Sequence, residues 1–476
     1  MVRKGPSPVT LSQERAPLFE ALLQYVQTVK APLHVPGHKM GRAAPPLWRE
    51  FLGERALSID LTEAPGLDDL HAPEGAIAEA QELAAQAFGA AASFFLVGGT
   101  TAGLHALVLA ACRPGDTIAV PRHAHRSVAG ALILSGAKPA WIRTRFHPEL
   151  DLAEGIHEAS LTEALQTSSA LVLVHPTYFG HVDRLAMAVQ QAHASEIPVL
   201  VDEAHGTHFA FHPDLPPPAL ATGADGVVQS VHKTGGSLTQ SSLCHLGADH
   251  RLDRPRLAEM LRLVQSTSPS YLLMASLDLA RRELYHSGYA AWDRVLDLAV
   301  GTRKRLCALR GIRVHPSADP TKIVIDVRGR GITGVQAAQS LWSEGVAVES
   351  SGLGFVLAVL SPGDSIETVD YLVGATNRLP HGPGVPPPPP EPPWPETVLI
   401  PREAALGRKR LVPLGDAVGL IAAETVAPYP PGIPVVTPGE RLTPEVISYL
   451  QHVSQAGYRL QGPADPTLSA IQVVEE

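Results

Sequence analysis

Two charged side chains come at the ends of apolar runs, where a parallel sheet would present them to a ligand. Asp202 ends the run VLVD, and Lys233 directly follows GVVQSVH. A lysine forms a Schiff base with an aldehyde once its surroundings lower its pKa, and a carboxylate can hold a cationic ring nitrogen. Taken alone, each residue is explained at least as well by a solvated lysine or by a helix cap. Together they predict a pyridoxal phosphate site.

The segment GGTTAG, residues 98–103, joins an apolar run to an expected helix. Its glycines allow close backbone approach. The free N–H groups of a helix N-terminus, together with the hydroxyls of Thr100 and Thr101, favour a phosphate. An ordinary capped helix is the competing interpretation. The segment lacks the lysine of nucleotide-binding P-loops, so a nucleoside triphosphate site is not supported.

His125 follows the next apolar run, in PRHAHRS, where an imidazole can stack on a planar cofactor. The chain has 21 histidines, and histidines usually have ordinary structural roles. Neither an H-E-x-x-H motif nor a comparable cluster occurs, so no metal is expected. The three cysteines, Cys112, Cys244 and Cys307, are too few and too widely spaced for a disulfide framework, which favours a reducing cytoplasm.

Strands and helices must position these residues. Between residues 93 and 233, short apolar runs alternate with helix-like stretches. Such a pattern predicts an open α/β domain with a parallel sheet, which binds ligands at the carboxyl ends of its strands. The expected strands are 93–97, 117–120, 139–142, 170–176, 199–204 and 226–232, with helices at 101–111, 161–166 and 184–194.

A second pattern begins after Pro269, with a helix at 272–285, strands at 322–327, 346–350 and 355–360, and helices at 335–344 and 366–379. The proline-rich stretch that follows cannot hold a helix or a central strand and predicts an extended spacer. We therefore expect an N-terminal arm at 1–60, a large cofactor-binding domain at 61–280, a small α+β domain at 281–381, a linker at 382–395 and a C-terminal domain at 396–476.

Composition and charge exclude several classes of protein. The 476 residues carry a net charge of -9, which argues against nucleic acid as a partner. A hydrophobic content of 45% with 18% charged residues supplies a core and excludes a largely disordered chain. The most apolar stretch, residues 91–112, is interrupted by glycines and threonines, and the N-terminus shows no signal peptide. The sequence thus predicts a cytoplasmic enzyme without a membrane partner.

Taken together and in their order, these segments resemble the Orn/Lys/Arg decarboxylase family of fold type I pyridoxal-phosphate enzymes. The resemblance covers nearly the whole chain, and the number of matches makes it specific. Its segments are HVPGHKMG (34–41), LTEAPGLDDLHAPEG (61–75), FFLVGGTTAG (94–103), RPGDTIAVPRHAHRSV (113–128), LVDEAHGTH (200–208), SVHKTGGSLTQ (230–240), STSPSYLLMASLD (266–278) and YPPGIPVVTPGE (429–440).

The resemblance implies a large cofactor domain, a smaller α+β domain, a C-terminal domain and a role for individual residues. Lys233 would carry the Schiff base, Asp202 would bind the pyridinium nitrogen and His125 would lie against the ring. Lys233 or His232 would return a proton to the substrate carbon. The other cofactor residues that it implies are Thr100, Thr101, Ser230 and His232 around the phosphate, with Ala204 and His205 beside the ring.

The implied reaction is decarboxylation of a basic amino acid. Short members without an N-terminal wing resemble biosynthetic arginine decarboxylases, so we expect conversion of arginine to agmatine, a step toward polyamines. Lysine or ornithine, giving cadaverine or putrescine, are the alternatives, followed by a fold type I transferase or a catalytically silent relative. Larger relatives carry a wing, and a tryptophan where this chain has His205, so ring packing at that position is expected to differ.

The resemblance also implies a homodimer or larger homo-oligomer with a shared active site. HVPGHKMG, which contains His38, and STSPSY would help to close the neighbouring subunit's pocket, although a structural arm is the alternative for His38. A carboxylate should meet the distal cation of the substrate, because a guanidinium favours a bidentate partner. The candidates are Asp68, Asp69 and Glu440, each of which a solvated surface position would explain as well.

Overall fold

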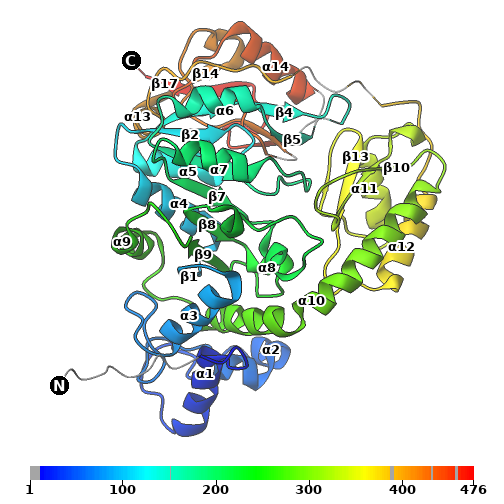
Figure 1. Ribbon diagram of the computed structural model, residues 1–476. Coiled ribbons are helices and arrows are strands. Elements are labelled where there is room, and N and C mark those ends of the chain that lie inside the picture. Colours follow the sequence, from blue (N-terminus) through cyan, green and yellow to red (C-terminus); the bar gives the residue numbers. More distant parts are fainter. Residues whose placement is uncertain are drawn as a thin grey trace.

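The computed structural model describes residues 11–150, 152–385, 387, 391–429, 432–455 and 459–475. A seven-stranded sheet occupies the middle of the molecule, a four-stranded sheet lies to one side of it, and the C-terminal elements lie along its far end (Figure 1). The expected linker at 382–395 falls partly outside the described residues, and so do Pro430 and Pro431 of the YPPG motif. No helix in the described part of the chain combines the length and apolar character that crossing a bilayer requires.

The central sheet has the strand order β1-β9-β8-β7-β6-β2-β3. Its strands are β1 (Ala92–Leu96), β2 (Thr117–Pro121), β3 (Lys138–Ile142), β6 (Ala170–Val174), β7 (Val199–Asp202), β8 (Gly226–Gln229) and β9 (Ser242–Leu246). The expected parallel sheet is confirmed from β8 to β3, but β9 was not anticipated and pairs antiparallel with both β1 and β8. The segment between β8 and β9 contains only the four-residue helical turn α8 and no crossover helix, which is consistent with an antiparallel neighbour.

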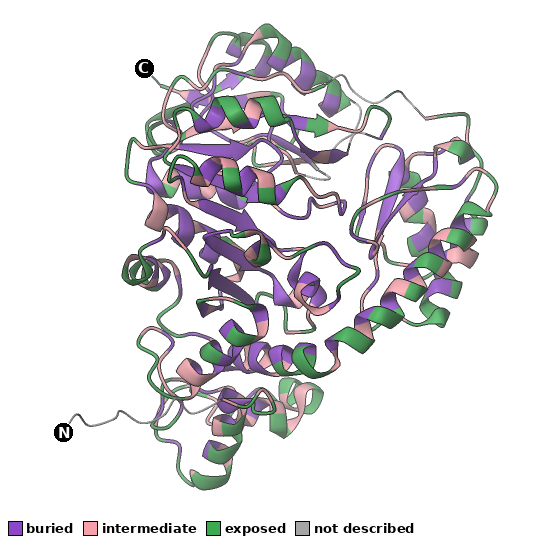
Figure 2. Ribbon diagram, viewed as in Figure 1, coloured by how far each residue is buried: buried purple, intermediate pink, exposed green. Residues whose placement is uncertain are grey.

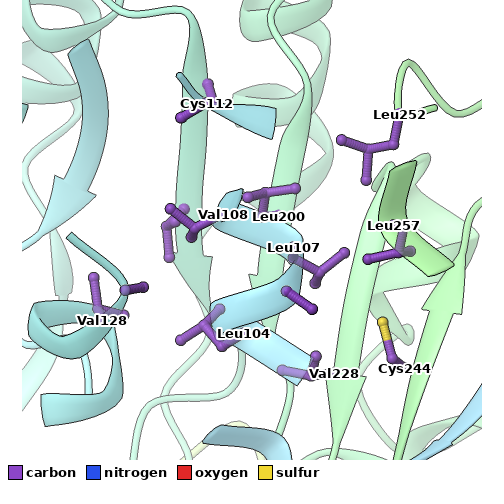
Figure 3. Close-up of a cluster of buried hydrophobic side chains, with 14 of the residues drawn as sticks. Leu104, Leu107, Val108, Cys112, Val128, Leu200, Val228, Cys244, Leu252 and Leu257 are labelled. Atoms are coloured by element: carbon purple, nitrogen blue, oxygen red, sulfur yellow. The ribbon is translucent and has the colours of Figure 1, made fainter. Parts of the chain in front are cut away.

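Helices cover both faces of this sheet. The first face carries α4 (Gly99–Ala111), α5 (Arg126–Ser135) and α9 (Arg254–Val264), and the second carries α6 (Glu158–Leu165) and α7 (Leu185–His193). Successive residues of β7 alternate between these layers. Leu200 belongs to the same buried cluster as Leu107 of α4 (Figure 3), while Val201 belongs to the cluster on the other face, with Leu185 of α7. Because both faces are buried, the strands have near-continuous apolar sequences (Figure 2).

The N-terminal segment packs against a long helix. Its helices are α1 (Pro17–Thr28), α2 (Pro46–Ser58) and α3 (Ala76–Phe88), and α10 extends over 37 residues, Tyr271–Cys307. The buried Asp278 of α10 accepts the backbone N–H of Leu18 at 3.0 Å and binds Arg281 at 2.7 Å. The sequence predicted only the first part of α10, and the domain boundary expected after residue 280 falls inside this helix.

The four-stranded sheet is antiparallel, with the order β10-β11-β13-β12. Its strands are β10 (Arg313–His315), β11 (Lys322–Asp326), β12 (Ser350–Ser351) and β13 (Phe355–Val359), and α11 (Gly334–Ser343), α12 (Ile366–Asn377) and the second half of α10 pack on it (Figure 1). The strand expected at 346–350 was wrong in extent, since within it only residue 350 pairs with β13.

The remaining elements connect and extend these units. Short helical turns are η1 (Thr207–Phe211), η2 (Ala219–Thr222), α8 (Val231–Thr234), η3 (Arg328–Arg330) and η4 (Leu414–Ala417), and β4 (Thr144–Phe146) pairs with β5 (Ala153–Ile156). Toward the C-terminus lie α13 (Pro401–Leu406), β14 (Lys409–Pro413), β15 (Ala427–Tyr429), α14 (Pro444–Gln455), β16 (Arg459–Gln461) and β17 (Ala470–Val474). The elements from β14 onward surround an apolar core of their own, whereas α13 packs on α5.

Candidate active site

A pocket lies beyond the carboxyl ends of β2, β6 and β7. It is the position at which open α/β sheets bind ligands, because the loops that follow neighbouring strands converge there. Apolar walls come from Val174 at the end of β6, Phe179 after it and Ile433 of the C-terminal segment. Six of the side chains singled out in the sequence also line it: Thr100, His125, Asp202, Ala204, His205 and Lys233.

Lys233 lies in the helical turn α8, because β8 ends at Gln229 rather than continuing to residue 232 as expected. Its Nζ atom lies 2.9 Å from Nε2 of His205. Part of the lysine side chain is exposed toward the open pocket, but protein atoms surround the amine. This desolvation lowers the pKa of Lys233, against the opposing attraction of Asp202. A lysine of this kind is a better nucleophile than a solvated one.

Asp202 is the last residue of β7 and is buried. Its Oδ1 atom accepts the backbone N–H of Ala204 at 3.1 Å, and its carboxylate lines the pocket. A buried carboxylate that faces a cavity is costly without a positive partner. The geometry therefore fits a ligand that brings a cationic nitrogen to this wall.

His125 caps the N-terminus of α5. Its Nδ1 atom accepts the backbone N–H of Ser127 at 3.2 Å, which leaves the ring proton on Nε2. Burial lowers the pKa of His125, while Asp202 opposes that shift and Lys233 adds to it. The imidazole is thus held neutral and oriented on the pocket wall, as stacking on a planar ring requires.

An anion site is available at the beginning of α4. The residue before the helix is Gly98, which has no side chain to cap the first turn, and Gly99 has a φ of 71°. The first-turn N–H groups therefore have no side-chain acceptor and point toward any bound anion. Next to them, Oγ1 of Thr100 lies 3.1 Å from Oγ of Ser230, so two hydroxyls from different elements meet at this point.

Two further residues expected around the cofactor lie at neighbouring cavities. Thr101 lines a cavity that it shares with His125 and α5. His232 lines another, beside Lys233 and α10, and the Nδ1 atom of its ring lies 2.9 Å from the carbonyl oxygen of Ser241, which makes Nδ1 the donor. Neither side chain is part of the main pocket wall.

The expected substrate carboxylates are engaged elsewhere. Asp68 has a φ of 69° and its Oδ2 accepts the N–H groups of Gly75 at 2.8 Å and Ile77 at 2.9 Å, so it caps α3. Asp69 accepts the N–H of His71 at 2.8 Å. Within one chain, neither carboxylate lines the main pocket.

Glu440 and His38 also have partners outside the pocket. Glu440 is fully buried in a bidentate pair with Arg122, with Oε2 and Nη2 2.8 Å apart. His38 lies in the N-terminal segment, with its Nε2 3.1 Å from Oδ2 of Asp60. Both residues therefore have structural partners in the single chain.

Two residues near the pocket were not found from the sequence. Lys322, the first residue of β11, is fully buried and places Nζ 2.9 Å from Nδ1 of His205. Tyr178 lines the pocket, its ring meets His205 edge-on, and its hydroxyl donates to Glu349 at 2.8 Å. The clue to Lys322 was a charged residue opening an otherwise apolar strand, but a solvated strand end would have given the same pattern.

One group of side chains outside the pocket has the spacing of metal ligands, namely His147, Glu154 and His315 in the described part of the chain. Nδ1 of His147 accepts the backbone N–H groups of Glu149 at 3.1 Å and Leu150 at 3.2 Å. A neutral ring then carries its proton on Nε2, the nitrogen that a metal would need. The group is better suited to a hydrogen bond between imidazole and carboxylate.

Comparison with known families agrees with the order of motifs along the chain. A model of the Orn/Lys/Arg decarboxylase major domain matches residues 16–324, and a model of the C-terminal domain of that family matches residues 394–465. The chain belongs to the Orn/Lys/Arg decarboxylase family. It is therefore a pyridoxal-phosphate-dependent enzyme of the class that the sequence predicted, and the family assignment is confirmed.

Similarity within this family extends over the whole chain. An arginine decarboxylase of Bacillus subtilis is 41% identical over 98% of this chain and 99% of its own length, and one of Bacillus anthracis is 40% identical over 98% of both. A lysine decarboxylase of Pseudomonas aeruginosa is 25% identical over 92% of this chain and 76% of its own length.

Solved structures confirm the fold. The constitutive lysine decarboxylase of Escherichia coli superposes with a TM-score of 0.84, at 22% identity, over 98% of this chain and 82% of its own. A serine palmitoyltransferase with pyridoxal phosphate has a TM-score of 0.50, at 16% identity, over 63% of this chain and 75% of its own. The fold type I prediction is therefore correct.

Proposed function

We propose that this chain decarboxylates arginine to agmatine with pyridoxal phosphate as cofactor. The observation that carries the proposal is the convergence of Lys233, Asp202 and His125 on one pocket, since an amine, a carboxylate and a planar ring are what this cofactor needs. The choice of arginine is supported by sequence identity. The chain is 41% and 40% identical to two arginine decarboxylases over nearly its whole length, but only 25% identical to a lysine decarboxylase.

The residues present fit the cofactor at each of its ends. Lys233 would hold its aldehyde carbon, Asp202 its ring nitrogen and His125 one face of the ring. The uncapped first turn of α4, with Thr100 and Ser230, would hold the phosphate. When bound, pyridoxal phosphate supplies an electron-accepting ring that stabilises the electron pair left behind as carbon dioxide departs.

The protein groups divide the remaining tasks. Asp202, buried and negative, favours a positive charge at the wall where the ring nitrogen would lie. Val174 and Phe179 make an apolar wall. A substrate carboxylate placed there is poorly solvated, which favours its release as uncharged carbon dioxide while the electron pair stays on the α-carbon. A proton must then replace carbon dioxide on the α-carbon. Lys233 lines the pocket and His232 does not, which supports Lys233 as the group that delivers it.

The direct test is carbon dioxide release from arginine, lysine and ornithine by the purified chain loaded with pyridoxal phosphate. We expect the highest kcat/KM with arginine and agmatine as the product. A higher kcat/KM with lysine or ornithine would show that this amino acid, and not arginine, is the preferred substrate. Release of carbon dioxide from none of them, in a preparation that shows the absorbance of protein-bound cofactor, would overturn the decarboxylase proposal.

We also propose that two copies pair to complete the site. Large apolar side chains of the N-terminal segment are exposed in the single chain, including Leu33 at 92%, Leu47 at 81% and Phe51 at 81%. Exposed apolar surface of this kind is typical of a protein interface. Mixing two inactive variants, Lys233→Ala and His38→Ala, should then restore part of the activity. Failure to recover activity after demonstrated subunit exchange would contradict a shared site.

A further inference from the structure

His205 connects two lysines that come from different sheets. Its Nε2 atom lies 2.9 Å from Nζ of Lys233, and its Nδ1 atom lies 2.9 Å from Nζ of Lys322. Lys322 is fully buried at the start of β11 and does not itself line the pocket. The row Lys322, His205, Lys233 therefore runs from the core of the four-stranded sheet to the pocket.

The protons in this row can be counted. A lysine ammonium has three donors and no acceptor, while a neutral imidazole has one donor and one acceptor. Two ammonium groups would need two acceptor nitrogens on one ring, which a neutral imidazole does not have. One of the two lysines must therefore be an uncharged amine that accepts the ring N–H.

The surroundings decide which lysine keeps its charge. Asp319 is fully buried beside Lys322, and its Oδ2 atom has no hydrogen-bond partner among the described residues. Its other oxygen accepts from Thr321 at 2.7 Å and lies 3.4 Å from Nε2 of His208. A buried carboxylate requires positive charge nearby, and the attraction between Asp319 and Lys322 favours the charged form of both.

The protein is also shaped around this buried lysine. Gly180 has a φ of 84°, and a Cβ atom built there would lie 2.8 Å from Cγ of Lys322. Any larger residue at that position would collide with the lysine side chain. The loop after β6 thus passes closely over Lys322, which fixes the direction in which its amine approaches His205.

We propose that Lys322 is a positioning residue that sets the protonation of Lys233 through His205. Its ammonium donates to Nδ1 of His205, so the ring carries its proton on Nε2 and donates it to an uncharged Lys233. This inference rests on the proposed function, because an uncharged Lys233 is the form that can attack the cofactor aldehyde. The arrangement gives the enzyme a reactive lysine without a carboxylate as general base.

The electrostatics of the row agree with this assignment. Burial is the main cause that lowers the pKa of His205, and the charge of Lys322 lowers it further. Burial lowers the pKa of Lys322 to about 8, still above neutrality, against the attraction of Asp319 and Glu349. The ionisable groups that face the row are Asp202, Asp319, Glu349, His125, His208 and Tyr178, and Arg303 lies at the Lys322 end, where it donates to the Lys322 carbonyl oxygen at 2.8 Å.

The test is the pH dependence of cofactor capture. The full-length chain is freed of cofactor, pyridoxal phosphate is added, and the rate of covalent capture at Lys233 is followed by absorbance and by borohydride trapping with peptide mapping. In Lys322→Met we expect the midpoint of the rate profile to move up by about one pH unit, because a nearby positive charge is lost and His205 can then accept from a charged Lys233.

Two variants serve as controls. Lys304→Met removes an exposed lysine from α10 and should leave the midpoint unchanged. Lys322→Arg keeps the buried charge and should keep the midpoint near that of the wild type. An unshifted midpoint in a Lys322→Met protein that still captures the cofactor would overturn the inference.

Lys322→Met could also affect folding, since it removes one of the positive charges that act on the buried Asp319. The double variant Lys322→Met/Asp319→Asn removes both charges and should show the same shift. A second measurement needs no change at Lys322. Nitrogen-15 NMR of the wild-type chain reports which ring nitrogen of His205 carries the proton, and the His205 signals are assigned by their loss in His205→Gln. Protonation at Nε2 is expected, and protonation at Nδ1 would overturn the inference.

These readouts are independent of the substrate. A shifted midpoint in a chain that releases no carbon dioxide from arginine would contradict the proposed function and leave the role of Lys322 intact. Arginine decarboxylation together with an unshifted midpoint would support the proposed function and contradict the role of Lys322.

Discussion

Two regions of the molecule hold charged side chains in different surroundings. One is the carboxyl edge of the seven-stranded sheet, and the other is the start of β11 in the four-stranded sheet. At the first, Asp202 and Lys233 face an open pocket and make few hydrogen bonds to the protein. At the second, Lys322 and Asp319 are fully buried and lie beside one another. Charges at the pocket edge can still bind a ligand. The charges at the start of β11 attract each other and bind neighbouring protein groups, Lys322 to His205 and Asp319 to His208.

This difference predicts separate consequences for substitutions. A change at the pocket edge should remove activity and leave the fold intact, because the side chain supports little packing. A change in the buried set should alter both stability and activity, because each group there compensates another.

The largest expected effect is that of Lys233→Ala. Turnover should fall by at least about a thousandfold, because no other amine in the pocket can take the place of Lys233. Thermal unfolding should be nearly unchanged, since the side chain is partly exposed. The measurements are carbon dioxide release and the absorbance of protein-bound cofactor, with Lys304→Ala as the matched control. Residual activity above a tenth of the wild type would show that the reactive amine lies elsewhere.

A smaller effect is expected at the next pocket residue. Asp202→Asn should keep the cofactor but lower kcat/KM by about a hundredfold, equivalent to ~3 kcal/mol, because a neutral amide no longer favours a positive ring nitrogen. Glu203 is the matched control, since it adjoins Asp202 but does not line the pocket. Near-normal kcat/KM in Asp202→Asn would refute the role of this carboxylate.

Glu203 supplies the contrast because both of its oxygens have protein partners. They accept from the N–H of Ala219 at 2.7 Å and from Nε2 of Gln229 at 2.6 Å, and burial raises the pKa of Glu203 to about 8. The folded chain thus keeps the proton that the unfolded chain loses above pH 4.5, and stability falls as the pH rises from there toward 8. Glu203→Gln should keep normal turnover, and its Tm should fall less than that of the wild type between pH 5 and pH 9.

The pocket edge could be anticipated from the sequence because its residues lie in successive strand and loop units. Asp202, His125 and Thr100 each follow or end an apolar run, and the carboxyl ends of parallel strands meet along one edge. Lys322 could not be found in this way. Its approach to His205 depends on how one sheet packs against another, which no local pattern encodes.

The same limit applies to β9 and to the long helix α10. The sequence SLCHL is apolar enough for a strand, but its place between β1 and β8 follows from tertiary pairing. The helix pattern of residues 272–285 was recognised, yet the helix continues to residue 307 because its later part packs on the four-stranded sheet. Amphipathic patterns predict the existence of an element better than its extent.

Little effect on turnover is expected at Glu440, the sequence candidate for the substrate's distal cation. Glu440 accepts from Arg122 and from the N–H of Thr437 at 2.7 Å, and Arg122 directly follows β2, three residues before His125. The pair therefore ties the C-terminal domain to the segment that carries a pocket residue.

Glu440→Gln leaves the buried guanidinium of Arg122 without its counter-charge and should destabilise the fold by about 3–5 kcal/mol. Below its Tm, the variant should show nearly the wild-type KM for arginine if the carboxylate only pairs with Arg122. A tenfold or larger rise in KM, with kcat retained, would instead mean that Glu440 meets the substrate cation. Glu344→Gln, which breaks the exposed pair with Arg378, is the matched control and should leave both Tm and KM unchanged. A fall in Tm without a change in KM would show that Glu440 acts like Lys322 and Asp319, as a buried charge that binds other protein groups and not the substrate. This would hold even though Glu440 belongs to neither sheet.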